Sequence, residues 1–159
     1  SVMVIAHPFP VILMKWIIIH VQFNHLMTFC HLPVPNLKIF SQYLLRKKLH
    51  VVATAKNGAE AVQQYERHRA SGNPINLILM DINMPMMDGK EASQKIRAFE
   101  RENCLKPAVI IISSGNCMES EIKKCLDPEG LIRAQSFLKK PVQYDALSLT
   151  IDELTHQLA

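Results

Sequence analysis

The chain has 159 residues, which is enough for one domain of ordinary size with an additional segment. Its composition, 48% hydrophobic and 20% charged, is that of a globular protein, and a net charge of +4 is too small to indicate nucleic-acid binding without a clustered basic patch. The four cysteines (Cys30, Cys104, Cys117 and Cys125) form no CxxC pair. They therefore support neither a zinc site nor a redox motif, and they favour free thiols in a reducing compartment.

The N-terminal segment differs from the rest of the chain. Residues 1–35 contain one formal charge, Lys15, and the first carboxylate of the whole sequence is Glu60. No repeat or low-complexity tract occurs in the chain. This uneven distribution of acids limits the metal chemistry that the N-terminal part can support.

Helices and strands are predicted to alternate from residue 36 onward. The segment 36–50 has helical spacing, and "VVATA" (51–55) is a short β-branched strand. The next helix begins at Asn57, a good N-cap, and Glu60 three residues later can bond back to the start of the helix. "NLILM" (76–80) is continuously apolar, as expected for a strand that is covered on both faces.

The same alternation continues to the C-terminus. Helices are predicted at 90–103 and 118–125, and strands at 108–112 and 136–141. Apolar residues form a helical stripe in the last segment: Leu147, Ile151, Leu154 and Leu158. Strands that alternate with helices of this length predict an α/β fold with a parallel sheet and right-handed crossovers.

Polar groups stand at the ends of three predicted strands. Asp81 follows "NLILM", Ser113 and Ser114 follow "AVIII", and Lys140 ends "SFLKK" just before Pro141. In open parallel sheets, functional sites lie beyond the carboxyl ends of the strands. A carboxylate, a hydroxyl and an ammonium at the same edge of the sheet would form a binding site for an anionic group that becomes covalently bonded to the carboxylate.

Three motifs resemble one known family. "LMDINMPMMDG" (79–89), "NGAEAV" (57–62) and "FLKKP" (137–141) are similar to the motifs of response-regulator receiver domains, the phosphoacceptor modules of histidine–aspartate phosphorelays. The resemblance covers residues 36–156. It implies a flavodoxin-like (βα)5 fold with a five-stranded parallel sheet in the order 2-1-3-4-5.

The resemblance also implies roles for particular residues. Asp81 would accept a phosphoryl group from a donor histidine, and Lys140 would pair with its charge. Ser114 would hydrogen-bond the phosphoryl oxygens, with Ser113 as the alternative. Asp81 and the backbone carbonyl of Asn83 would be ligands to Mg²⁺.

Four further positions match the family pattern. Pro85, Gly89 and Pro141 would shape the loops around the site. Phe137 occupies the position of an aromatic switch, although an ordinary core phenylalanine would look the same.

The sequence departs from the family at the metal site. "VPNLKIF" (34–40) is similar to the start of the family's first helix, and counting back from it puts two expected acids at His31 and Leu32. Neither is a carboxylate, and no acid lies upstream. Because Mg²⁺ is usually held through carboxylates, we expect the chain to bind it poorly.

Two segments compete for the first strand. "VMVIA" (2–6) resembles the family's first strand, and "HLMTFC" (25–30) is the other candidate. With the first choice, residues 7–33 interrupt the domain, and we hypothesise that they are a translated intron or a similar insertion. The chain would then consist of an atypical N-terminal segment (1–35) that supplies the first strand, and a receiver domain (36–159). A membrane helix and a zinc site are weaker alternatives for this segment, because Lys15 interrupts the apolar run and the spacing of its histidines matches no known zinc motif.

Two functions follow from these patterns. The first is a cytoplasmic phosphoacceptor domain of a two-component phosphorelay whose partner is a histidine kinase or a histidine phosphotransfer protein. The loops at 100–107 and 126–135 resemble those of eukaryotic hybrid histidine kinases. The second is a degenerate receiver that lacks the acidic pair and acts as a protein-interaction module. In both cases we expect no enzyme activity beyond weak autophosphorylation and autodephosphorylation, and no contact with nucleic acid or membrane.

Overall fold

Helices and strands alternate along most of the chain, as the sequence predicts. The computed structural model describes residues 17–21, 25–29, 42–43, 46, 49–51, 53 and 55–158. Its elements are β1 (Ile17–Val21), β2 (His25–Phe29), β3 (Leu49–Val51), α2 (Gly58–Ala70), β4 (Leu77–Asp81), α3 (Gly89–Glu102), β5 (Val109–Ser114), α4 (Glu119–Leu126), β6 (Ser136–Lys139) and α5 (Tyr144–Leu158). Of the helix predicted at 36–50, the described residues 42, 43 and 46 are helical.

A three-stranded parallel sheet carries the C-terminal part of the chain. Its order is β4-β5-β6, and every residue of β4 and β5 is buried. The register aligns Asp81 with Ser113, and Ser114 with Lys139. The parallel arrangement predicted for these three strands is therefore confirmed.

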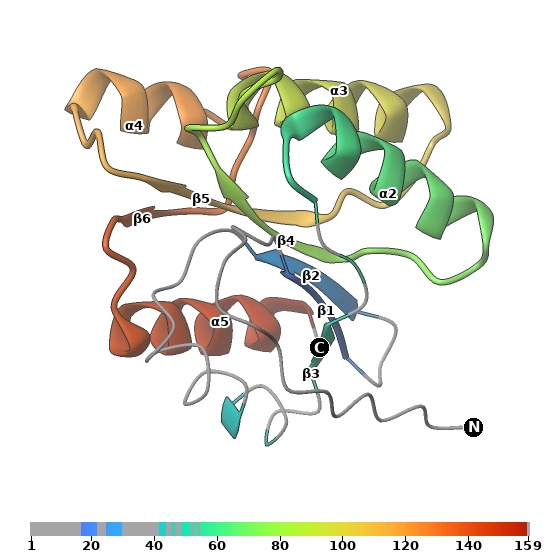
Figure 1. Ribbon diagram of the computed structural model, residues 1–159, viewed down its shortest axis with the longest axis horizontal. Helices are drawn as coiled ribbons and strands as arrows, with labels where there is room; N and C mark the ends of the chain where they lie inside the picture. The colour runs from blue at the N-terminus through green and yellow to red at the C-terminus, as the bar shows by residue number, and fades with distance from the viewer. Residues whose placement is uncertain are drawn as a thin grey trace.

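Helices cover both faces of this sheet. Figure 1 shows α2, α3 and α4 on one side and α5 on the other. Ile78 and Met80 of β4 belong to the core beneath the first group of helices, whereas Leu77 and Leu79 belong to the core beneath α5. Because successive side chains of a strand point to opposite faces, both sets must be apolar, and this explains the continuous apolar run in the sequence.

The described N-terminal strands form a separate sheet. β1 lies between β2 and β3 and is antiparallel to both, a pairing that the sequence analysis did not predict. Only three residues separate β1 from β2, which is enough for a hairpin but too short for a parallel crossover. The described strands thus form two sheets of three, and the predicted single sheet of five stays a prediction.

The identity of the first receiver strand stays a prediction. The candidate at 25–30 corresponds to strand β2 of the structure. β2 contacts β4, but the described strands show no hydrogen-bonded pairing between the two. The candidate at 2–6 lies outside the described residues, as do His31 and Leu32. The order 2-1-3-4-5 therefore corresponds to observed pairing only in its last three strands.

The cap of α2 is as predicted, but the strand before it is shifted. Asn57 Oδ1 accepts the Glu60 N–H (2.9 Å), and Glu60 Oε2 accepts the Lys56 N–H (2.7 Å). The strand predicted at 51–55 is instead β3, which ends at Val51. Residues 53 and 55, which the structure also describes, belong to no strand.

A buried polar cluster joins α2, α3 and two loops. The Arg97 guanidinium donates to Glu100 Oε2 (2.7 Å) and to the carbonyls of Ala108 (2.8 Å) and Ile132 (2.9 Å). Tyr65 donates its hydroxyl to Glu100 Oε1 (2.8 Å). Burial, and then the nearby Glu100 carboxylate, raise the pKa of Tyr65 above its usual range. This cluster was not predicted, since Arg and Glu three residues apart on a helix usually face solvent.

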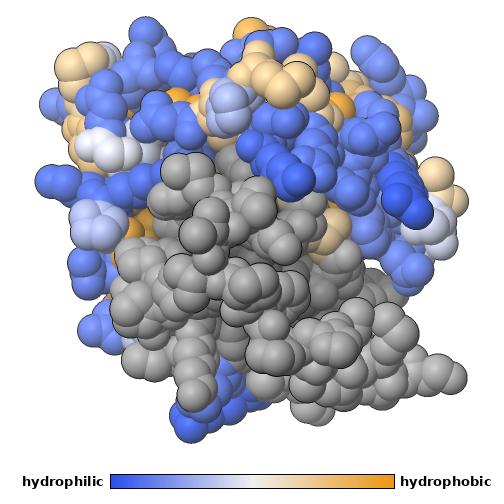
Figure 2. All heavy atoms as spheres, in the orientation of Figure 1, coloured by the Kyte–Doolittle hydropathy of each residue, from blue (hydrophilic) through white to orange (hydrophobic). Residues whose placement is uncertain are grey.

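The face seen in Figure 2 is mainly hydrophilic over the described residues, and its hydrophobic residues are scattered. Among the helices that the structure describes, none has the length and apolar character needed to cross a membrane.

Candidate functional site

Asp81 is the last residue of β4, where the buried apolar run delivers it to the edge of the sheet. Its side chain is only 6% exposed. Oδ1 accepts the backbone N–H of Asn83 at 2.9 Å, and Oδ2 forms an ion pair with the ammonium of Lys140. The carboxylate is therefore held at both oxygen atoms by groups from two different strand ends.

Lys140 directly follows β6 and is fixed by its backbone as well as by its charge. Its N–H donates to the carbonyl of Ser114 at 2.8 Å, which continues the pairing of β5 with β6 by one residue. The side chain is 20% exposed. Because the Asp81 carboxylate is almost fully buried, this pair is screened less than an ion pair on the surface.

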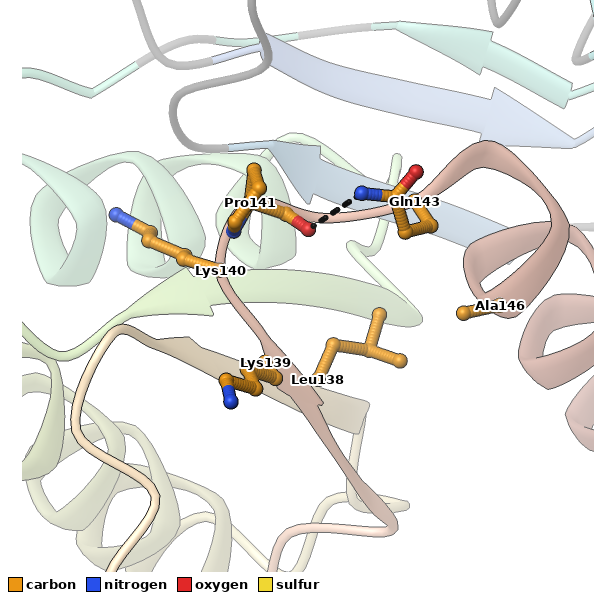
Figure 3. A pocket seen from close by; sticks show the side chains of 6 residues that line it. All are labelled: Leu138, Lys139, Lys140, Pro141, Gln143 and Ala146. Atoms are coloured by element: carbon orange, nitrogen blue, oxygen red, sulfur yellow. Dashed lines mark hydrogen bonds between the residues drawn. The ribbon is translucent and has the colours of Figure 1, made fainter.

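A cavity of about 340 Å³ lies beside Lys140 at the junction of β6 and α5. Its lining residues are Leu138, Lys139, Lys140, Pro141, Gln143 and Ala146. In Figure 3 the Lys140 side chain extends away from Leu138 and Ala146. Since the ammonium pairs with Asp81, which is not among the lining residues, this cavity is distinct from the Asp81 site.

The two serines at the end of β5 are both buried but differ in their contacts. Ser114 Oγ accepts the backbone N–H of Asn116 at 3.1 Å, so this hydroxyl stabilises the turn after the strand. Ser113 Oγ has no hydrogen-bond partner. Asn116 was not recognised from the sequence as a neighbour of the site, although "SSGN" has the composition of such a turn.

The loop between β4 and α3 folds back against Asp81. Gly89 donates its N–H to the carbonyl of Ile82 at 3.0 Å, and Met87 donates to the carbonyl of Pro85 at 2.8 Å. A Cβ atom at Gly89 would lie 1.9 Å from the backbone oxygen of Asp81. Only glycine allows the start of α3 to approach the end of β4 this closely. Asp88 caps α3 by accepting the Glu91 N–H at 2.8 Å.

Phe137 and Pro141 lie close to the site along β6. Phe137 is partly buried against the core beneath α2, α3 and α4. Pro141 follows Lys140 through a cis peptide bond and lines the cavity described above. The switch role of Phe137 stays a prediction.

The described residues do not make a magnesium site. No group of three or more His, Cys, Asp or Glu side chains converges anywhere in this part of the chain. Both oxygens of Asp81 already accept hydrogen bonds, one of them from a cation. Mg²⁺ requires anionic oxygen ligands that keep a net negative charge around it, and a single carboxylate paired with Lys140 does not supply this.

Comparison with known proteins identifies relatives of this domain. Residues 34–152 match the response regulator receiver domain family, so the match begins after the positions of the expected acids. The chain is 35% identical over 116 residues to the peroxide stress-activated histidine kinase mak1 of Schizosaccharomyces pombe, covering 73% of this chain and 7% of that protein. It is 32% identical over 110 residues to the chemotaxis protein CheY of Bacillus subtilis, covering 69% of this chain and 80% of CheY.

Solved structures give the same result. The complex of the Saccharomyces cerevisiae histidine phosphotransfer protein Ypd1 with the receiver domain of Ssk1 matches with a TM-score of 0.61 and 30% identity, over 77% of this chain and 83% of that one. The CheX-CheY-BeF3-Mg complex of Borrelia burgdorferi matches with a TM-score of 0.60 and 27% identity, over the same shares. The likeness indicates a flavodoxin-like receiver fold, and this chain belongs to the response regulator receiver domain family.

Proposed function

We propose that this domain accepts a phosphoryl group on Asp81 from a phosphohistidine. The observation that carries the proposal is the buried ion pair between Asp81 and Lys140. A carboxylate oxygen of Asp81 forms the new bond to phosphorus, the bond from phosphorus to the donor nitrogen breaks, and its electron pair stays on the imidazole. Phosphoryl transfer of this kind depends mainly on alignment and on neutralisation of charge.

The residues around Asp81 support this reaction in three ways. The backbone N–H of Asn83 holds the carboxylate in one orientation, which leaves less to be ordered in the reaction. Lys140 provides a positive charge that can follow the phosphoryl oxygens. The Ser114 hydroxyl accepts one hydrogen bond in the loop and keeps its proton available for donation to a phosphoryl oxygen.

The donor in this proposal is a histidine kinase or a histidine phosphotransfer protein. The support is the similarity to the receiver domain that was solved together with Ypd1, and to hybrid histidine kinases. We place this exchange in the cytoplasm. Phe137, which lies partly buried near the site, would respond to the new charge as a switch.

The test is incubation with acetyl phosphate or a phosphohistidine donor, followed by borohydride trapping and mass spectrometry. We expect one labelled residue, Asp81, and loss of the label in Asp81→Asn. Asp88→Asn is the matched control, because Asp88 is an exposed acid in the same segment and asparagine preserves the cap of α3. A label that persists in Asp81→Asn would refute the proposal.

A second candidate is a degenerate receiver that acts only through protein contacts. Two observations favour it: the sequence holds no acid before Glu60, and no cluster of metal-binding side chains occurs among the described residues. In this case Mg²⁺, which the receiver family typically binds, would bind weakly or not at all.

A repaired variant separates the two candidates. Residues 8–33 are removed and Asp-Asp is inserted after Ala6, which places two carboxylates where the family has them. We expect its affinity for Mg²⁺ to exceed that of the original chain, because two carboxylates restore a net negative site. Tight Mg²⁺ binding by the original chain would contradict the degenerate candidate.

A further inference from the structure

The loop that follows Asp81 carries a methionine whose exposure the phosphoryl transfer itself does not explain. We propose that Met86 is a contact residue for the protein that delivers the phosphoryl group, and that this partner places apolar side chains beside its phosphohistidine. This inference rests on the proposed function, because it concerns how the donor docks at Asp81.

Met86 has a strained backbone conformation. Its φ is 67°, in the left-handed region that favours glycine. The Met87 N–H donates to the carbonyl of Pro85 at 2.8 Å, so Met86 is the central residue of a three-residue turn. With a positive φ at its centre, this is the rarer and more strained of the two kinds of γ-turn. Such strain persists only where the surrounding structure holds it, and it is concentrated at functional sites.

The start of α2 holds the turn in place. The Gly58 N–H donates to the carbonyl of Met87 at 3.0 Å, and Asn57 Nδ2 donates to Met86 Sδ at 3.6 Å. A Cβ atom at Gly58 would lie 2.6 Å from the Met87 backbone oxygen, so only glycine allows this approach. The first two residues of "NGAEAV" therefore do more than begin a helix: they also fix the turn that carries Met86.

The side chain of Met86 is 89% exposed. Among the residues that the structure describes, the other strongly exposed large apolar side chains are Met118, Leu131 and Leu149. Met118 lies just after β5, which is parallel to β4, so both methionines follow strand ends at the edge that holds Asp81. At Met86 a strained turn and an apolar side chain in water coincide, and contact with a partner accounts for both.

The burial of Asp81 requires the donor to contact this loop. The Asp81 side chain is only 6% exposed, and reacting atoms must approach to about 3–3.5 Å. A phosphohistidine can come this close only if the protein surface around it closes over the loops at the strand ends. Removing an exposed methionine from water is favourable when it packs against apolar side chains. The partner that fits is therefore a histidine phosphotransfer protein with apolar residues around its histidine, whereas a small donor needs no such contact.

The test compares a protein donor with a small one. Phosphorylated Ypd1 and acetyl phosphate are each incubated, with Mg²⁺, with the wild-type chain, Met86→Gly and Met86→Leu, and the rate of Asp81 phosphorylation is measured. We expect Met86→Gly to lower the rate with Ypd1, relative to that with acetyl phosphate, by about tenfold, the lower end of the effect of burying one methionine side chain. Met86→Leu keeps an apolar side chain and should retain most of the transfer from Ypd1.

Thermal melts show whether the effect arises through the fold. Met86→Gly should melt at the same temperature as the wild type or higher, because glycine adopts a positive φ without strain. Leu131→Gly is the matched control for docking. Leu131 is 62% exposed, but it lies in the loop before β6, at the opposite edge of the sheet from Asp81, so its loss should leave transfer from Ypd1 unchanged.

The outcomes separate this inference from the proposed function. Equal transfer from Ypd1 to the wild type and Met86→Gly would overturn the inference and leave the phosphoacceptor role standing. A wild-type chain that acetyl phosphate labels on Asp81 but phosphorylated Ypd1 does not would also overturn the inference alone, because the inference commits to this class of partner. A wild-type chain that takes no label from either donor would overturn both.

Discussion

Replacement of Gly89 by alanine tests how closely the site depends on the contact between α3 and β4. The added Cβ would lie 1.9 Å from the Asp81 backbone oxygen, whereas real Cβ atoms stay beyond 3.0 Å. Because the atom in the way belongs to the backbone, it cannot move as a flexible side chain could. We therefore expect the added methyl group to lower the free energy of unfolding by about 3 kcal/mol, the upper end of ordinary overpacking. Alanine in place of glycine in a helix offsets roughly 1 kcal/mol of this. The net loss of about 2 kcal/mol corresponds to a fall in melting temperature of about 4–8 °C for a chain of this size.

Thermal melts monitored by circular dichroism measure this effect, with Gly115→Ala as the matched control. Nothing lies within 4 Å of a Cβ at Gly115, so that variant should stay within about 0.5 kcal/mol of the wild type. Gly89→Ala should also reduce phosphorylation, because the displaced Asp81 backbone carries the carboxylate with it. If Gly89→Ala and Gly115→Ala melt at the same temperature, the close approach of the two backbones is not present in solution.

Three further predictions concern charged groups. Lys140→Ala should lower the free energy of unfolding by about 1–3 kcal/mol, because it removes a partner from a buried carboxylate; chemical denaturation measures this, and an unchanged midpoint would contradict it. Arg97→Met should cost more, about 3–5 kcal/mol, since it removes the buried cation that pairs with Glu100; a variant of wild-type stability would contradict this. The hydrogen bond from the Lys90 ammonium (2.7 Å) lowers the pKa of Glu121. The stabilisation of the fold by this pair is therefore fully present above pH 4.5, the ordinary pKa of the carboxyl group, and is lost as the pH falls through the lowered pKa. NMR titration of the Glu121 carboxyl should show its pKa rising toward 4.5 in Lys90→Gln.

The second half of the fold could be predicted because its signals are local. The apolar runs of β4 and β5 and the cap formed by Asn57 and Glu60 each lie within a few consecutive residues. The pairing of Lys140 with Asp81 was also expected, because parallel strands bring their carboxyl ends to one edge.

The features that were not predicted depend on contacts between distant segments. The antiparallel pairing of β1 with β2 lies in a segment without clear periodicity, so no face could be assigned to it in advance. The third strand of that sheet, β3, begins in a segment to which helical spacing was assigned. The burial of Arg97 depends on carbonyls 35 and 36 residues further along the chain, which a helical pattern does not reveal. The difference between Ser113 and Ser114 likewise requires the register of the sheet and the turn at Asn116.

The Arg97 cluster has a consequence for sequence variation in the loop between α4 and β6. The guanidinium binds this loop mainly through the carbonyls of Ile132 and Arg133, which every amino acid possesses. One arginine of α3 thereby fixes the path of the loop backbone. It places no requirement on most of the side chains that the loop carries. Leu131, which is 62% exposed, illustrates a position that this anchoring leaves open to exchange. Such a loop can acquire new surface chemistry by substitution while its geometry, and that of β6 and Lys140 beyond it, is preserved.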